Sequence, residues 1–120
     1  MENLNKRRLG ADREMAAAAY LRQRGLVILE QNFRCRQGEI DIVCRDGSYL
    51  VFVEVKYRKN EEKGAPQEAV GIVKQKKICR VADYYRLIHS MGNDMDVRYD
   101  VVAIQGEKVT WIKNAFPHHY

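Results

Sequence analysis

The amino-acid sequence predicts an α/β fold in which a central mixed five-stranded sheet is flanked by helices. Three observations support this fold. An alanine-rich helical stretch comes first, a tight hairpin of two β-rich segments follows, and a basic amphipathic segment separates this hairpin from two further strands. A three-strand meander followed by a crossover helix implies a mixed sheet. At 120 residues the chain is long enough for one hydrophobic core and one domain.

The first helix is expected at residues 7–24. An alanine run at 16–19 favours a helix, and Gly25 suits the position just after its C-terminus, because glycine adopts positive φ without strain. Residues 1–6 are polar and are expected to be loose.

The hairpin is the most clearly patterned stretch of the chain. Its strands are expected at 39–45 and 49–57, around an Asp46-Gly47-Ser48 turn. Asp-Gly between two β-rich runs indicates a hairpin because the turn needs positive φ. The remaining elements are expected to be strands at 26–33, 97–104 and 108–112, a polar loop at 58–66, a helix at 67–90 that Gly71 can interrupt, and a loose segment at 115–120.

The charge and hydropathy of the sequence indicate which partners and which cellular location to expect. The net charge of +5 fits a polyanionic partner. No apolar run reaches the roughly 18 residues of a membrane span, and residues 1–6 lack a signal-peptide core, so we expect a cytoplasmic protein with no membrane partner.

Cys35, Cys44 and Cys79 are widely spaced and odd in number, which argues against a disulfide framework and against a thiolate zinc site. We expect Cys44 and Cys79 to be core residues.

The end of the hairpin carries charged side chains on apolar strands. Glu54 and Lys56 lie two residues apart, so their side chains share one face, and Glu39 and Asp41 do the same on the other strand. Opposed side chains on adjacent strands approach to about 5 Å. Two carboxylates at that distance can share a Mg²⁺ ion, which prefers oxygen ligands.

In this interpretation Lys56 would orient a water molecule or offset charge on a phosphate, and Glu39 would support the site from outside the ligand set. The alternative is a solvated strand end whose charges pair with one another. Spacing alone leaves both interpretations open.

Glu14 lies on the same side of the first helix as Ala17, Ala18 and Leu21. From spacing alone, Asp12 and Glu14 would complement the positive N-terminal end of this helix.

Basic side chains gather in three stretches, and Lys and Arg neutralise phosphates in a salt-sensitive, sequence-independent way. These candidates for nucleic-acid binding are Arg34, Arg36, Arg58, Lys59, Lys74, Lys76, Lys77 and Arg80. The alternative is a solvated basic helix face. No base-reading element is apparent, so any selectivity should be for DNA shape.

The hairpin resembles a known signature. Asp41 followed after twelve residues by Glu54-Val55-Lys56 is similar to the pattern of the PD-(D/E)xK nuclease superfamily, which includes restriction endonucleases and archaeal Holliday-junction resolvases. More narrowly, the chain resembles the YraN family of small bacterial proteins of unknown role. The matching segments, within residues 8–105, are Tyr20-Leu21 with Gly25, residues 32–41, residues 51–58, Gly64-Ala65-Pro66, Lys74 and Arg98-Tyr99-Asp100.

This resemblance implies a restriction-endonuclease-like fold and a nuclease that uses Mg²⁺ or Mn²⁺. It implies that Asp41 and Glu54 are metal ligands, with the Val55 carbonyl as a third. Lys56 would be the catalytic lysine, and Glu14 the helix-borne acid that resolvase-like folds bring to the metal. The chain departs from the family pattern beside this acid, where an arginine stands in place of the usual glycine.

The sequence therefore leads to the hypothesis of an endonuclease that hydrolyses phosphodiester bonds in branched, flapped or junction DNA, with DNA favoured over RNA. A homodimer would fit the two-fold related strands of such DNA. Two alternatives remain: a non-catalytic nucleic-acid-binding or adaptor module that keeps the fold, and a protein-interaction domain with an accidental acidic cluster.

Overall fold

The structure, a computed structural model, describes residues 2–58, 70–92 and 95–120, with side chains from Asp12 onward. Its elements follow the predicted order of one helix, three strands, one helix and two strands. They are α1 (Glu2–Gln23), β1 (Val27–Cys35), β2 (Gly38–Asp46), β3 (Tyr49–Arg58), α2 (Ile72–Ile88), β4 (Asp96–Gln105) and β5 (Lys108–Phe116).

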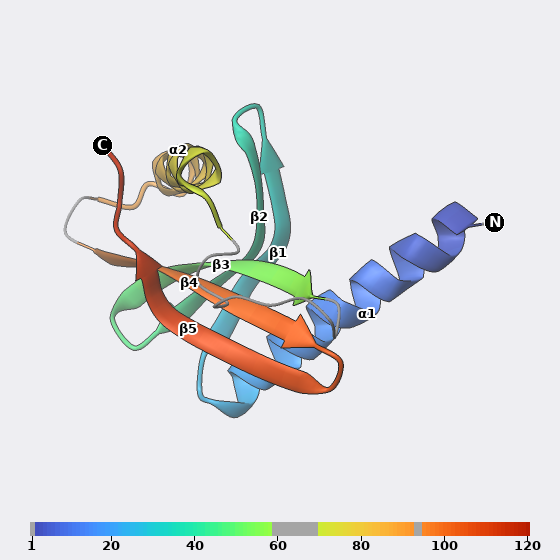
Figure 1. The fold of residues 1–120 in the computed structure, drawn as a ribbon. Helices are drawn as coiled ribbons and strands as arrows, with labels where there is room; N and C mark the ends of the chain where they lie inside the picture. Colours follow the sequence, from blue (N-terminus) through green and yellow to red (C-terminus); the bar gives the residue numbers. More distant parts are fainter. Residues whose placement is uncertain (1, 59–69, 93–94) are drawn as a thin grey trace.

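The five strands form one mixed sheet in the order β1-β2-β3-β4-β5. Strands β3 and β4 pair in parallel, and the other neighbours pair antiparallel. The α2 segment makes the crossover between the two parallel strands (Figure 1). The predicted mixed five-stranded sheet flanked by helices is thus confirmed, in an arrangement compatible with a restriction-endonuclease-like fold.

Each helix covers a different face of the sheet, because successive strand residues point to opposite faces. Leu50 and Phe52 of β3 pack with the buried face of α2, including Tyr85. Val51 and Val53 belong to the second core, which α1 completes with Ala17, Ala18 and Leu21. Cys44 and Cys79 are fully buried, as predicted, one in each core.

The helix boundaries differ from those predicted. Helix α1 begins at Glu2 rather than near residue 7, so part of the expected loose segment is helical. Helix α2 begins at Ile72 with Gly71 as its N-cap, in line with the expected interruption there. The expected loop at 58–66 and helix start at residue 67 fall mostly on residues 59–69, which lie outside the described residues.

The C-terminal residues lie against α2 instead of extending away from the fold. The His118 ring stacks on Tyr99, and its Nδ1 is 2.6 Å from the Tyr99 hydroxyl. His119 Nε2 is 2.9 Å from Oε1 of Gln75 on α2. Strand β5 itself continues to Phe116, beyond its predicted end at residue 112. Sequence patterns gave no sign of these contacts, since each joins residues far apart in the chain.

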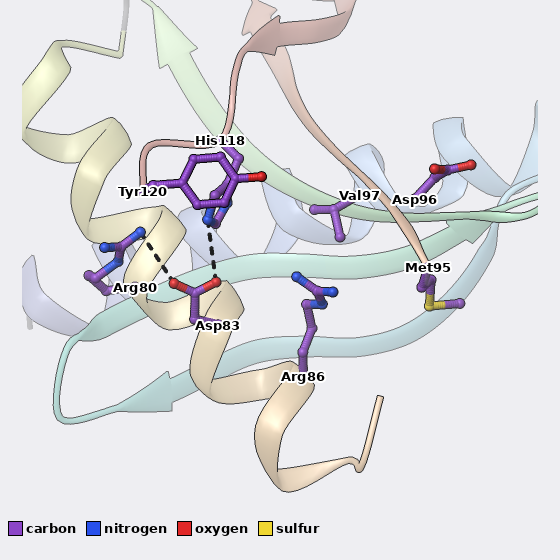
Figure 2. Close-up of a pocket in the computed structure, with 8 residues that line it drawn as sticks. All are labelled: Arg80, Asp83, Arg86, Met95, Asp96, Val97, His118 and Tyr120. Carbon is purple, nitrogen blue, oxygen red and sulfur yellow. Dashed lines mark ion pairs between the residues drawn. The ribbon is translucent and has the colours of Figure 1, made fainter. Parts of the chain in front are cut away.

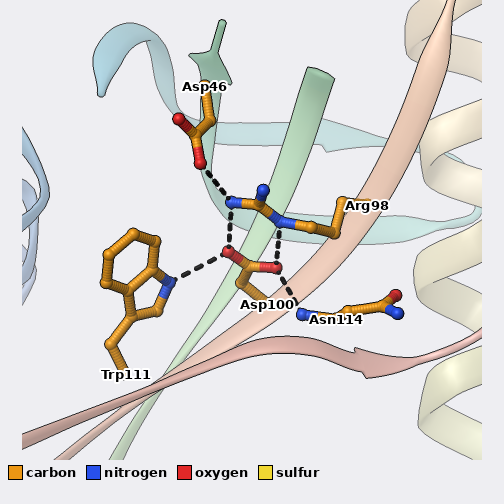
Figure 3. A network of polar contacts seen from close by, with 5 residues as sticks. All are labelled: Asp46, Arg98, Asp100, Trp111 and Asn114. Carbon is orange, nitrogen blue, oxygen red and sulfur yellow. Dashed lines mark hydrogen bonds and ion pairs between the residues drawn. The ribbon is translucent and has the colours of Figure 1, made fainter. Parts of the chain in front are cut away.

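A buried ion network joins β4, β5 and the last residue of β2 (Figure 3). Asp100 is fully buried and accepts two hydrogen bonds from the Arg98 guanidinium, at 2.9 and 3.0 Å. It also accepts the indole N–H of Trp111 and the backbone N–H of Asn114, each at 2.9 Å. Arg98 reaches Asp46 at 2.9 Å. The buried charges are therefore paired, which satisfies the usual condition for burying them.

In the described part of the chain, no helix is long and apolar enough to cross a membrane.

Candidate active site between β2, β3 and α2

The candidate site lies at the fork, the point where β2 separates from β3. The ladder between these strands ends at the Ile42–Val53 pair. Asp41 and Glu54 are the next residues along each strand. Beyond the last pair, the backbone N–H of Val55 donates a 2.8 Å hydrogen bond to Oδ2 of Asp41. The carboxylate thus serves as the acceptor that a strand backbone would otherwise supply.

Asp41 lies among other carboxylates. Its pKa is raised from 3.8 to about 7, first by burial and then by the charge of Glu54. The hydrogen bond from Val55 lowers this pKa, and the charges of Glu14 and Glu39 raise it further. Mutually repelling acids at one partly buried point are what a bound cation would stabilise.

Glu54 is buried and already has a cationic partner. Its Oε1 accepts a 2.5 Å hydrogen bond from Nζ of Lys74 in the first turn of α2. Burial lowers the pKa of Lys74, but the bond to Glu54 and the charge of Asp41 leave this pKa raised overall. Lys74 therefore stays charged at neutral pH.

Helix α1 carries Glu14, whose charge acts on Asp41. Glu14 is half-buried, and its charge is among those that raise the pKa of Asp41. It lies well beyond the first turn of α1, where a helix dipole has little effect, so the capping interpretation of Glu14 is wrong. The neighbouring Arg13 guanidinium lies 3.1 Å from the centre of the Tyr57 ring, which fixes α1 against the end of β3.

Lys56 is half-buried on β3, on the same face as Glu54. Its side chain lies beside that of Lys74. The side chain of Val55 points to the other face, toward the core under α1, so only its backbone faces the acids. The fork therefore brings the acids of β2 and β3 together, with Lys56 on the face of Glu54, and Glu14 acts on Asp41 through its charge.

A cavity of about 180 Å³ opens at the fork between the strands and α2. It is lined by Gly38, Glu39, Asp41, Glu54, Lys74, Lys77, Ile78 and Val81. Gly38 adopts φ +147°, a conformation that side chains rarely tolerate. A Cβ there would also lie 3.4 Å from Val81. Glycine is thus favoured at the start of β2 by its backbone conformation, beside Val81 of α2.

The predicted nucleic-acid-binding residues differ in how exposed they are and in how close they lie to the cavity. Arg34 is exposed and lies 3.4 Å from Glu39 at the rim of the cavity. Arg36 is exposed in the β1–β2 turn, and Lys76 is exposed on α2. Lys77 lines the cavity, as do Gly38 and Glu39 at the start of β2.

The other basic candidates are less available. Arg80 pairs with Asp83 at 3.2 Å and donates to the carbonyl of His119. Arg58 is half-buried at the end of β3 and already has an interaction partner. Lys59 lies outside the described residues.

A larger cavity, of about 670 Å³, lies farther along α2, beside the start of β4 and the C-terminal residues (Figure 2). It is lined by Arg80, Asp83, Arg86, Met95, Asp96, Val97, His118 and Tyr120. Asp83 pairs with both Arg80 and His118, the latter at 3.5 Å. None of the residues at the fork lines it. We place the candidate site at the smaller cavity because the acids and lysines converge there.

Sequence reasoning missed two features. Lys74 was expected to bind nucleic acid, with a solvated basic face as the alternative, and its distance along the chain from Glu54 gave no sign of the ion pair. The Arg98–Asp100 network was visible only as an unexplained Arg-Tyr-Asp match. Its buried acid could have been suspected from its place within an apolar strand.

Comparison with known proteins identifies the family. The family described as "Uncharacterised protein family UPF0102" matches residues 13–104. The chain belongs to this family. UPF0102 is the YraN family, so the resemblance noted from the sequence is confirmed.

Several UPF0102 relatives match most of the chain. One from Lachnoclostridium phytofermentans is 50% identical over 94% of this chain and 96% of its own length. One from Syntrophus aciditrophicus is 45% identical, covering 99% of this chain and 94% of its own. One from Legionella pneumophila is 41% identical, covering 86% and 89%. Their names give the family and no activity.

Proposed function

We propose that this UPF0102 protein is a metal-dependent endonuclease that hydrolyses phosphodiester bonds in structured DNA. The observation that supports it most is the convergence of Asp41 and Glu54 at the fork, with Lys56 on the same face as Glu54. The charge of Glu14 on α1 adds to this support, because it raises the pKa of Asp41. Two acids from neighbouring strands at one partly buried place are costly to the fold unless they serve a charged ligand.

The residues at the fork fit a hard divalent cation. Asp41 and Glu54 offer carboxylate oxygens, and the Val55 backbone offers a carbonyl, which are ligand types that Mg²⁺ and Mn²⁺ accept. Within residues 12–58, 70–92 and 95–120, no three acidic, His or Cys side chains group closely enough to hold a metal by themselves. Water and a substrate phosphate would therefore complete the ligand set, as is common for Mg²⁺.

Each side chain then has a definite role. A bound divalent ion would polarise a phosphoryl oxygen and lower the pKa of a water molecule. The Val55 N–H holds the Asp41 carboxylate in position. Lys56 would hold the attacking water or offset charge on the phosphate. Glu14 and Glu39 would act from outside the ligand set, by adding negative charge near Asp41.

The DNA would be held by basic residues around the cavity. Arg34, Arg36 and Lys77 lie on or beside the elements that line it, and such contacts give salt-sensitive affinity without reading bases. Selectivity would then come from DNA shape, as in a junction, a flap or an end.

A second candidate is a non-catalytic nucleic-acid-binding module that keeps the fold. The Lys74–Glu54 ion pair favours it, because it occupies one of the two proposed carboxylate ligands. Under this alternative the acids and lysines would neutralise each other permanently.

Metal titration separates the two candidates. Calorimetry with MnCl₂ should show one binding event in the wild type, lost in Asp41→Asn and Glu54→Gln. Glu107→Gln, which removes an exposed acid in the β4–β5 turn, is the matched control and should bind Mn²⁺ normally. The same proteins are then given labelled junctions, flaps, single strands and duplexes with Mn²⁺. Cleavage by wild type and by Glu107→Gln alone supports the nuclease; DNA binding without Mn²⁺ binding or cleavage overturns it.

A further inference from the structure

Lys74 and Glu54 form an unequal ion pair. The Glu54 side chain is 8% exposed and belongs to β3, whereas the Lys74 side chain is 45% exposed and reaches in from α2. The buried Glu54 carboxylate has little access to water outside the pair. Lys74 has a flexible four-carbon stem and can swing its ammonium group into water. The lysine is therefore the partner that can leave.

We propose that the Lys74 ammonium is a built-in counter-ion of the fork, which a divalent cation must displace in order to bind Glu54. This inference rests on the proposed function, since it concerns the same two carboxylates. Lys74 neutralises one of the acids in the metal-free protein, where an unpaired buried carboxylate would be costly. A divalent cation can neutralise Asp41 and Glu54 together, which one ammonium group cannot.

The two cations exclude each other for two reasons. The ammonium group already contacts Oε1 of Glu54 at 2.5 Å, so an ion bound to that oxygen would compete for the same position. Two cations a few ångströms apart in a partly buried site also repel strongly. The free energy needed to move the Lys74 ammonium group away from Glu54 therefore lowers the apparent affinity for the metal. A protein whose binding-competent conformation is only partly populated binds its ligand more weakly for the same reason.

The inference is tested by calorimetric titration of MnCl₂ into wild type, Lys74→Met, Lys74→Arg and Lys77→Met. Lys74→Met keeps the length of the side chain and removes its charge, and should bind Mn²⁺ about tenfold more tightly than wild type. Lys74→Arg restores the charge and should return the affinity to within about threefold of wild type. Lys77→Met removes a charge from the same cavity without touching the Glu54 pair, and should change the affinity less than threefold.

The outcomes distinguish this inference from the proposed function. Mn²⁺ binding by the wild type with equal or weaker binding by Lys74→Met would overturn the displacement and leave the metal site standing. An equal gain in Mn²⁺ affinity in Lys77→Met would mean that any lost positive charge near the cavity has this effect, and would overturn the displacement too. Binding by Lys74→Met alone would support displacement in its strongest form. Absence of binding in all four proteins would overturn the proposed function and this inference with it. Thermal unfolding with and without MnCl₂ gives a second readout, in which Lys74→Met should show the larger stabilisation.

Discussion

The backbone N–H of Val55 donates a 2.8 Å hydrogen bond to Oδ2 of Asp41, across the fork where β2 leaves β3. This contact fixes the position of the acid, because one of its oxygens is tied to the strand that carries Glu54. It also holds the ends of the two strands together where their ladder has stopped. Substitutions at Asp41 should therefore affect both the stability of the fold and its proposed chemistry.

The first prediction concerns stability and pH. The pKa of Asp41 is raised from 3.8 to about 7 by folding, so between these two pH values the Asp41 carboxyl group is protonated in the folded chain and ionised in the unfolded chain. The contribution of Asp41 to the free energy of unfolding should therefore fall as the pH rises from about 4 to about 7, and stay low above pH 7. Asp41→Asn keeps an acceptor for Val55 and removes the charge. In EDTA it should stabilise the protein by roughly 2 kcal/mol at pH 8 and much less at pH 5.

Thermal or urea unfolding at the two pH values measures this difference. Glu107→Gln, an exposed acid far from the fork in sequence, should show no such pH-dependent gain. Equal stability of Asp41→Asn and wild type at pH 8 would contradict the raised pKa.

The second prediction concerns Lys56. Lys56→Met should keep DNA affinity within about threefold of wild type, because one buried-face lysine contributes little to phosphate neutralisation, yet lower the cleavage rate by a factor on the order of 100. DNA binding by fluorescence anisotropy and cleavage of the labelled DNA panel give the two readouts. Lys108→Met, at an exposed position, should change neither. Cleavage by Lys56→Met at the wild-type rate would remove Lys56 from the mechanism.

The third prediction concerns the buried ion network. Asp100→Ala leaves the Arg98 guanidinium and the Trp111 N–H without their shared acceptor, and should destabilise the fold by about 3–5 kcal/mol. Asp96→Ala, at an exposed position on the same strand, should cost less than about 0.5 kcal/mol.

Urea denaturation followed by Trp111 fluorescence reports on both variants. If Asp100→Ala fails to fold, Asp100→Asn, which keeps an acceptor for the indole, provides the measurable intermediate case. A loss below about 1 kcal/mol in Asp100→Ala would mean that the network contributes little.

The fourth prediction concerns the C-terminal residues. His118→Ala removes the stacking on Tyr99 and the contact with its hydroxyl, and should destabilise the protein by about 1–2 kcal/mol. The Tyr120 ring touches His118 edge-on but is fully exposed, so Tyr120→Ala should have a much smaller effect. Thermal unfolding of wild type and the two variants tests this. A melting temperature of His118→Ala equal to that of wild type would mean that the C-terminal residues form the loose segment expected from the sequence.

Much of the fold was predictable because its signals are local. The Asp-Gly turn and the period-two pattern defined the hairpin, and Gly71, where an interruption was expected, is the N-cap of α2. The same period placed Glu54 and Lys56 on one face. These rules depend on a few neighbouring residues, so they hold whatever the rest of the chain does.

By itself, then, the sequence determined the mixed sheet, the two-helix arrangement, the family and the pair of strands that carry the acids. Tertiary structure decided that Glu14 lies far from the N-terminus of its helix, where its charge raises the pKa of Asp41, and that Lys74 pairs with Glu54. It also decided that the strands part at Asp41. The reason is physical: how a helix lies on a sheet, and where a ladder ends, depends on the packing of both cores at once, which no short stretch of sequence encodes.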